Sequence, residues 1–86
     1  MTTLQEQARA LGDPTRHQVF RYVADAAAPV DVYELTEHFG LNHNAIRQHL
    51  AKLVDAGLVV EEAAPSRGRG RPRFVYLDEP TTESRW

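Results

Sequence analysis

The sequence predicts a mainly α fold (α+β), with about four helices followed by a two-stranded antiparallel β-hairpin. Apolar residues recur at helical spacing in four segments, which are separated by glycine or proline. The pattern then changes to two short β-prone runs, residues 58–64 and 73–78. A loop rich in arginine, glycine and proline joins these runs, and this arrangement is typical of a hairpin.

Composition restricts the chain to one small domain. It has 86 residues, 42% of them apolar, and no cysteine, so it has neither a disulfide framework nor thiolate chemistry. No apolar run approaches the roughly 20 residues that span a bilayer, and the first residues do not follow the pattern of a signal peptide. We therefore expect a cytoplasmic chain that does not contact membranes.

The first expected helix covers residues 2–11 and ends at Gly12. Leu4, Ala8 and Leu11 lie at helical spacing and form one apolar stripe. This stripe can pack on the second helix or face another subunit, and the sequence leaves both alternatives open.

The second helix begins with Asp13 as its N-cap and Pro14 at the first helical position, where proline is well tolerated. We expect this helix to run to about Ala27, before Pro29. Its predicted apolar stripe is Val19, Phe20, Val23 and Ala27.

The third helix is capped by Asp31, and Glu34 three residues later completes an acidic variant of the capping box. Gly40 ends the helix in the left-handed conformation, which glycine adopts at little cost. The residues expected to face inward are Val32, Leu35 and Phe39.

A fourth helix follows after the tight turn, over about residues 43–56, with Asn42 as its cap and Gly57 at its end. Its predicted buried stripe is Ile46, Leu50, Leu53 and Val54. Two helices joined by a glycine turn are a helix-turn-helix, whose second helix enters the DNA major groove. The following hairpin would be a wing, so residues 1–77 are predicted to form a winged helix-turn-helix DNA-binding domain. Residues 78–86 are predicted to form a flexible C-terminal tail.

Four short motifs resemble one family. They are "DPTR", "EL-(x)3-FGL", "HL-(x)2-L-(x)2-AGLV" and "GRP-(x)3-Y", in this order and at this spacing over roughly residues 10–77. The chain resembles the ArsR-type winged-helix transcriptional repressors of prokaryotes. The resemblance implies a cytoplasmic, nucleoid-associated repressor that binds double-stranded DNA and occludes a promoter.

The predicted recognition helix carries polar side chains opposite its core stripe. Asparagine and glutamine read adenine and arginine reads guanine, and base-reading residues cluster at the N-terminal end of such helices. We expect base contacts from Asn44, Arg47 and Gln48. Phosphates would be held by His43, Lys52 and the free N–H groups at the start of this helix, next to Asn42.

The predicted wing tip, residues 66–73, reads "SRGRGRPR" and contains Arg67, Arg69, Arg71 and Arg73. Arginine is attracted to a narrow A·T-rich minor groove, and "RGRP" also looks like an AT-hook. These arginines are expected to enter a minor groove or to follow phosphates. The chain has a formal charge of -2, but residues 42–76 carry +3, so the net charge conceals a basic stretch.

Other functions find less support. No P-loop, HExxH or cysteine–histidine pair occurs, so we expect no enzyme, and we expect no metal or cofactor at the four histidines. The family resemblance implies a homodimer, for which the stripe of Leu4, Ala8 and Leu11 is the candidate interface. The alternative function is a winged-helix protein–protein interaction module, or an RNA-binding adaptor, that uses the arginine-rich loop as its contact surface.

Overall fold

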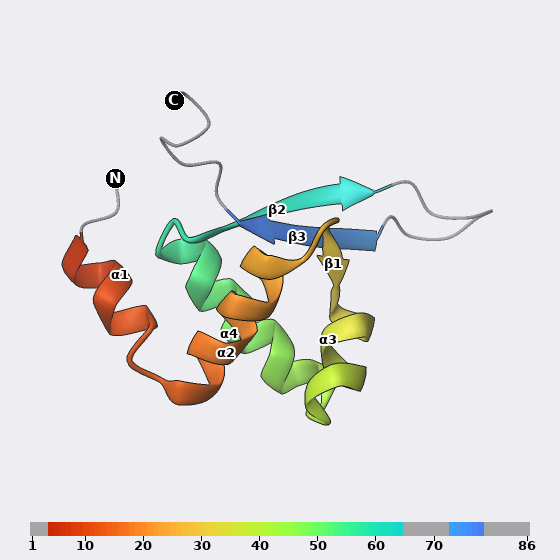
Figure 1. Ribbon diagram of the computed structural model, residues 1–86, viewed down its shortest axis with the longest axis horizontal. Helices are drawn as coiled ribbons and strands as arrows, with labels where there is room; N and C mark the ends of the chain where they lie inside the picture. The colour runs from red at the N-terminus through yellow and green to blue at the C-terminus, as the bar shows by residue number, and fades with distance from the viewer. Residues whose placement is uncertain (1–3, 65–72, 79–86) are drawn as a thin grey trace.

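The computed structural model describes residues 4–64 and 73–78, which form four helices and a three-stranded antiparallel sheet (Figure 1). The helices are α1 (Leu4–Ala10), α2 (Pro14–Asp25), α3 (Val32–Phe39) and α4 (His43–Asp55). The strands are β1 (Val30–Asp31), β2 (Val59–Ala64) and β3 (Arg73–Asp78). The predicted winged helix-turn-helix is confirmed: α3 and α4 form the helix-turn-helix, and β2 and β3 form the wing.

The sheet has the order β1-β3-β2, so β3 is its central strand. β1 pairs with β3 through Val30 opposite Tyr76 and Asp31 opposite Val75. The predicted two-stranded wing is present as β2 and β3, but the sequence did not predict β1, because a strand of two residues has no alternation from which to recognise it. Since α3 begins directly after β1, the sheet fixes the start of the helix-turn-helix.

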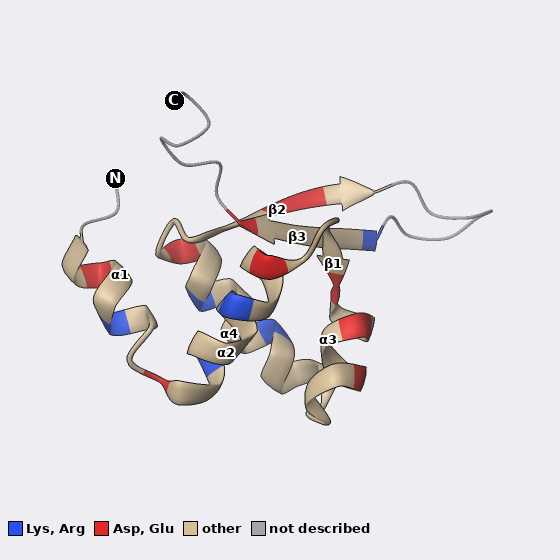
Figure 2. Cartoon of the chain, viewed as in Figure 1, with Lys and Arg blue, Asp and Glu red and all other residues tan. Residues whose placement is uncertain are grey.

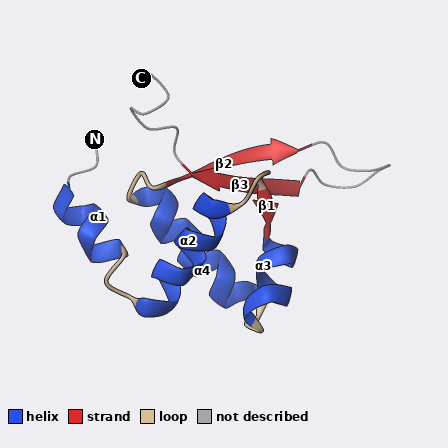
Figure 3. Cartoon of the chain, viewed as in Figure 1, coloured by secondary structure: helices blue, strands red, loops and turns tan. Residues whose placement is uncertain are grey.

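The molecule has two layers, with the helices on one side of the sheet (Figure 3). The apolar faces of α2, α3, α4 and the sheet meet between these layers and form one core, because each element has a single apolar side to bury. The core cluster contains Val19, Val23, Val30, Leu35, Ile46, Leu50, Leu53, Val59 and Tyr76. Helix α4 contributes three of these side chains, so its orientation is fixed by packing.

The predicted helix caps are confirmed at α2, α3 and α4. In each case the side-chain oxygen of the N-cap accepts a hydrogen bond from the backbone N–H three residues later, which otherwise has no partner in the helix. The distances are 2.9 Å for Asp13 and Arg16, 2.8 Å for Asp31 and Glu34, and 2.8 Å for Asn42 and Ala45. Gly40 has a φ of 68°, so the predicted left-handed end of α3 is also confirmed.

Three local predictions need correction. α2 ends at Asp25, which leaves Ala27 outside the helix and exposed rather than in the apolar stripe. α1 ends at Ala10, and Ala10 is its buried residue. The capping box at α3 is only half formed, because the Glu34 carboxylate accepts a 2.7 Å hydrogen bond from the Tyr22 hydroxyl instead. Glu34 therefore links α3 to α2.

Candidate nucleic-acid interface

Helix α4 is amphipathic, with an apolar side that faces the core and a polar side that faces solvent. Ile46, Leu50 and Leu53 are each at most 1% exposed and face the core. All six predicted recognition residues lie at exposed positions of α4 or its cap: Asn42, His43, Asn44, Arg47, Gln48 and Lys52. The structure therefore brings these residues together on one accessible helix.

Asn44 and Gln48 occupy the outermost side of α4. They lie one helical turn apart, with Ala51 on the same side, opposite the three core residues. Neither amide has a hydrogen bond to another residue in the part of the chain that the structure describes. Both amide groups are thus free to donate to and accept from an outside partner.

A groove of about 680 Å³ lies beside α4, between its N-terminal end, the start of α3 and the start of β3. We call it the α4–β3 groove. Its lining residues are Asp31, Val32, Tyr33, His43, Arg47, Arg73, Phe74 and Tyr76. Tyr33 is 66% exposed, and its ring centroid lies 6.1 Å from that of His43. The groove thus combines cations with aromatic rings, which together suit a sugar-phosphate chain.

Lys52 lies on the opposite flank of α4. It lines a hollow of about 360 Å³ between α1, α2 and α4, together with Arg9, Arg16 and Asp55. Arg47 and Lys52 are five residues apart, which turns their side chains roughly 140° from each other on a helix. The polar side of α4 is thus flanked by one cation on each side.

The wing arginines divide into two groups. Arg67, Arg69 and Arg71 lie outside the described residues. Arg73 is the first residue of β3, and its Nη1 forms an ion pair of 3.3 Å with Oδ2 of Asp31. Figure 2 shows a basic position at the start of β3 and an acidic one where β1 leads into α3. Arg73 therefore already has an acidic partner within the chain.

Sequence reasoning did not select five of the residues that line the α4–β3 groove: Asp31, Val32, Tyr33, Phe74 and Tyr76. Asp31 was interpreted as a helix cap only. Tyr33 and Phe74 are large apolar residues that remain 66% and 47% exposed. A tyrosine next to a helix cap, off the inward-facing stripe, was the signal that could have identified Tyr33.

Within residues 4–64 and 73–78, no three histidine or acidic side chains lie close enough together to hold a metal ion. None of the helices in the same ranges is long and apolar enough to cross a membrane.

Two comparisons with known proteins bear on the site. A family model described as "Bacterial regulatory protein, arsR family" matches residues 13–61, which run from the cap of α2 into β2. A protein of Halobacterium salinarum named "Putative arsenical resistance operon repressor ArsR2" is 34% identical over 83 residues, 96% of this chain. The chain spans 65% of the length of that relative. The matched family segment contains the whole helix-turn-helix.

Proposed function

The chain belongs to the arsR family of regulatory proteins, and from this we propose that it binds duplex DNA sequence-specifically and regulates transcription, as a repressor that occludes a promoter. The observation that carries the proposal is the free polar side of α4, with a cation on each flank. A recognition helix needs polar groups directed at base edges and cations on its flanks that can reach a base edge or a phosphate. α4 offers both.

The proposed base readers are Asn44, Arg47 and Gln48. The amides of Asn44 and Gln48 have the donor and acceptor pair that adenine requires, and the guanidinium of Arg47 suits guanine. His43 and Lys52 would hold phosphates on either side, together with the backbone N–H groups at the start of α4. Asn42 would act through the cap that it gives to this helix end.

The proposed wing contacts are those of Arg67, Arg69 and Arg71, at a minor groove or along its phosphates. The support comes from the sequence, in which these arginines alternate with glycine, and from the position of the wing strands, of which β2 packs against α4 and β3 pairs with β2. Arg73 is set apart because Asp31 neutralises it.

We further propose a homodimer that uses α1. Leu4 is 82% exposed and Ala8 is exposed as well, which leaves an apolar surface for a second copy. Leu11 contributes less than we expected, because it packs against the core of its own chain. A dimer would bind two half-sites and so a palindromic operator. A regulator of this kind would act in the cytoplasm, at the nucleoid.

The proposal is tested by gel-shift titration on random-sequence duplex at about 50 mM and about 200 mM salt. We expect binding at the lower concentration and a steep loss at the higher one, because several phosphates are neutralised. Selection from a random duplex pool should then yield one motif, with a palindrome if the protein is a dimer. The absence of any shift at low salt would exclude DNA as the partner and favour the protein- or RNA-binding alternative.

A further inference from the structure

Asp31 is unusual in the α4–β3 groove. Of the described residues that line this groove, it is the one carboxylate; the other ionisable ones are Tyr33, His43, Arg47, Arg73 and Tyr76. A carboxylate repels phosphates, so its position beside a proposed DNA-binding helix needs a physical reason.

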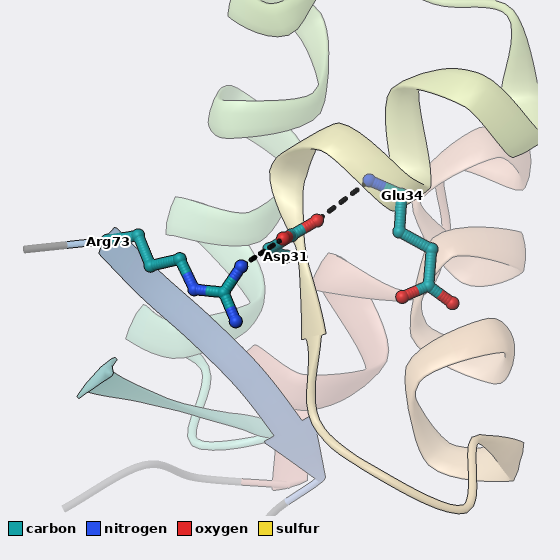
Figure 4. A network of polar contacts seen from close by, with 3 residues as sticks. All are labelled: Asp31, Glu34 and Arg73. Carbon is teal, nitrogen blue, oxygen red and sulfur yellow. Dashed lines mark hydrogen bonds and ion pairs between the residues drawn. The ribbon is translucent and has the colours of Figure 1, made fainter. Parts of the chain in front are cut away.

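The two oxygens of Asp31 have different partners (Figure 4). Oδ1 accepts the 2.8 Å hydrogen bond from the Glu34 N–H, which caps α3. Oδ2 lies 3.3 Å from Nη1 of Arg73. The backbone of Asp31 is paired with that of Val75, so Arg73 is its diagonal neighbour across the two strands. The cap and the strand register thus hold this carboxylate at the arginine.

The cap alone does not explain the negative charge. Asparagine caps a helix as well as aspartate does, since one side-chain oxygen is enough for the bond. The charge also interacts favourably with the dipole at the start of α3, and its side-chain partner is Arg73, which is 60% exposed beside the groove. Without the pair, Arg73 would face the groove as a free cation, like Arg47.

We propose that Asp31 holds Arg73 away from DNA phosphates and so limits the sequence-independent affinity of the protein. This inference rests on the proposed function. A phosphate contact from Arg73 would strengthen binding to every sequence alike, because phosphate contacts carry no sequence information. Each added phosphate contact steepens the dependence of log K on log salt by about 0.9. A regulator that must leave random DNA to find its operator benefits from one contact fewer.

The test compares binding of random-sequence duplex by the full chain and by D31N, R73Q and the double variant, between about 50 and about 200 mM salt. D31N keeps the cap of α3 and removes the charge. It should steepen the salt slope by about 0.9, so that its affinity falls about 3.5-fold more than that of the unmodified chain over this range. R73Q alone should leave the slope unchanged, and R73Q in D31N should return it to that of the unmodified chain. E37Q is the control, since it removes one exposed acid of α3 that does not line the groove.

Three results would overturn the inference while leaving DNA binding intact. In the first, D31N has an unchanged or shallower slope. In the second, R73Q alone lowers the slope by about 0.9, which would mean that Arg73 already contacts a phosphate. In the third, the steeper salt slope of D31N is also found in the double variant with R73Q, or E37Q steepens the slope equally. Asp31 would then act through the overall charge of the protein. If the unmodified chain does not bind DNA at low salt, the proposed function itself fails, and this inference fails with it.

Discussion

Tyr76 donates a 2.7 Å hydrogen bond from its hydroxyl to Oε2 of Glu61, its direct register partner across β2 and β3. The ring of Tyr76 is 7% exposed and belongs to the core, whereas Glu61 is exposed. The bond thus joins the core to the outer strand of the wing. Burial, and after it the bond to Glu61, raise the pKa of the Tyr76 hydroxyl above its ordinary value.

This raised pKa predicts a loss of stability at alkaline pH. Above the ordinary tyrosine pKa of 10.0, the unfolded chain releases the Tyr76 proton while the folded chain retains it. The contribution of Tyr76 to the free energy of unfolding should therefore be constant below about pH 10 and fall above it. Denaturant titrations at several pH values measure this decrease.

Two substitutions separate the effect of burial on the pKa of Tyr76 from that of its bond to Glu61. Y76F should lower the free energy of unfolding by about 1 kcal/mol at neutral pH, because one hydrogen bond is lost. Y76F should also reduce the fall in the free energy of unfolding at alkaline pH. Tyr22, whose pKa is raised mainly by its bond to Glu34, would account for part of the remainder. E61Q should keep most of the loss of stability above pH 10, since burial raises the pKa of Tyr76 more than the bond to Glu61 does. If this loss disappears in E61Q, the bond to Glu61 is the larger cause instead.

The turn of the helix-turn-helix depends on the backbone of Gly40. A Cβ at this position would meet no atom within 4 Å, but its φ of 68° is unfavourable for other residues. G40A should therefore lower the free energy of unfolding by about 1–2 kcal/mol through backbone strain alone. G40N should cost less, since asparagine adopts this conformation more readily. Equal melting temperatures for G40A and the unmodified chain would contradict the left-handed conformation of Gly40.

The cap of α4 allows stability and DNA binding to be varied independently. N42A removes the 2.8 Å bond to the Ala45 N–H and should lower the free energy of unfolding by about 1 kcal/mol. N42S and N42D should both keep the cap. N42D also places a negative charge where a phosphate is expected, so it alone of these two should weaken DNA binding. Thermal melts and gel shifts on the three variants check this prediction, and equal binding by N42S and N42D would place the start of α4 away from DNA.

The wing gives a prediction about sequence-independent affinity. R69A should weaken binding to specific and random duplex by the same factor and reduce the salt slope by about one unit. If Arg69 enters an A·T-rich minor groove, the loss should be greater on sites with A·T flanks. Titrations on two duplexes that differ only in their flanks make this comparison, and an unchanged slope would remove Arg69 from the interface.

The sequence predicted the helical part of the fold well, because its signals are local. The caps at Asp13, Asp31 and Asn42 and the left-handed Gly40 depend on neighbouring residues only, and the structure has all four. The exposed positions of the proposed recognition residues on α4 could also be predicted, since helical periodicity separates buried from exposed positions.

The remaining features depend on contacts between distant segments. β1 forms only because β3 pairs with it, and no pattern in two residues predicts that pairing. The ion pair between Asp31 and Arg73 joins residues 42 positions apart. The sequence therefore indicated only a helix cap at Asp31 and an unpaired wing arginine at Arg73. The α4–β3 groove arises from the same tertiary pairing, so the helix pattern could have identified Tyr33 as an exposed residue but not its place in this groove.

Arg47 gives the sharpest test of the proposal that α4 reads DNA. We predicted a base contact for Arg47, and its position on the flank of α4 beside the α4–β3 groove is also compatible with a phosphate contact. A base reader replaced by alanine should cost about 1–3 kcal/mol on the selected site and relax the preference at one base pair. A phosphate contact should instead cost the same on all sequences and lower the salt slope by about one unit.

K52A is the matched control for R47A, because Lys52 is an exposed cation on the opposite flank of α4. We expect K52A to lower the salt slope and to leave sequence preference unchanged. Binding of R47A to a set of single-base variants of the selected site, at two salt concentrations, distinguishes the two roles. If R47A behaves like K52A, base reading is left to Asn44 and Gln48, and the site should then be rich in A·T pairs, since both amides pair best with adenine.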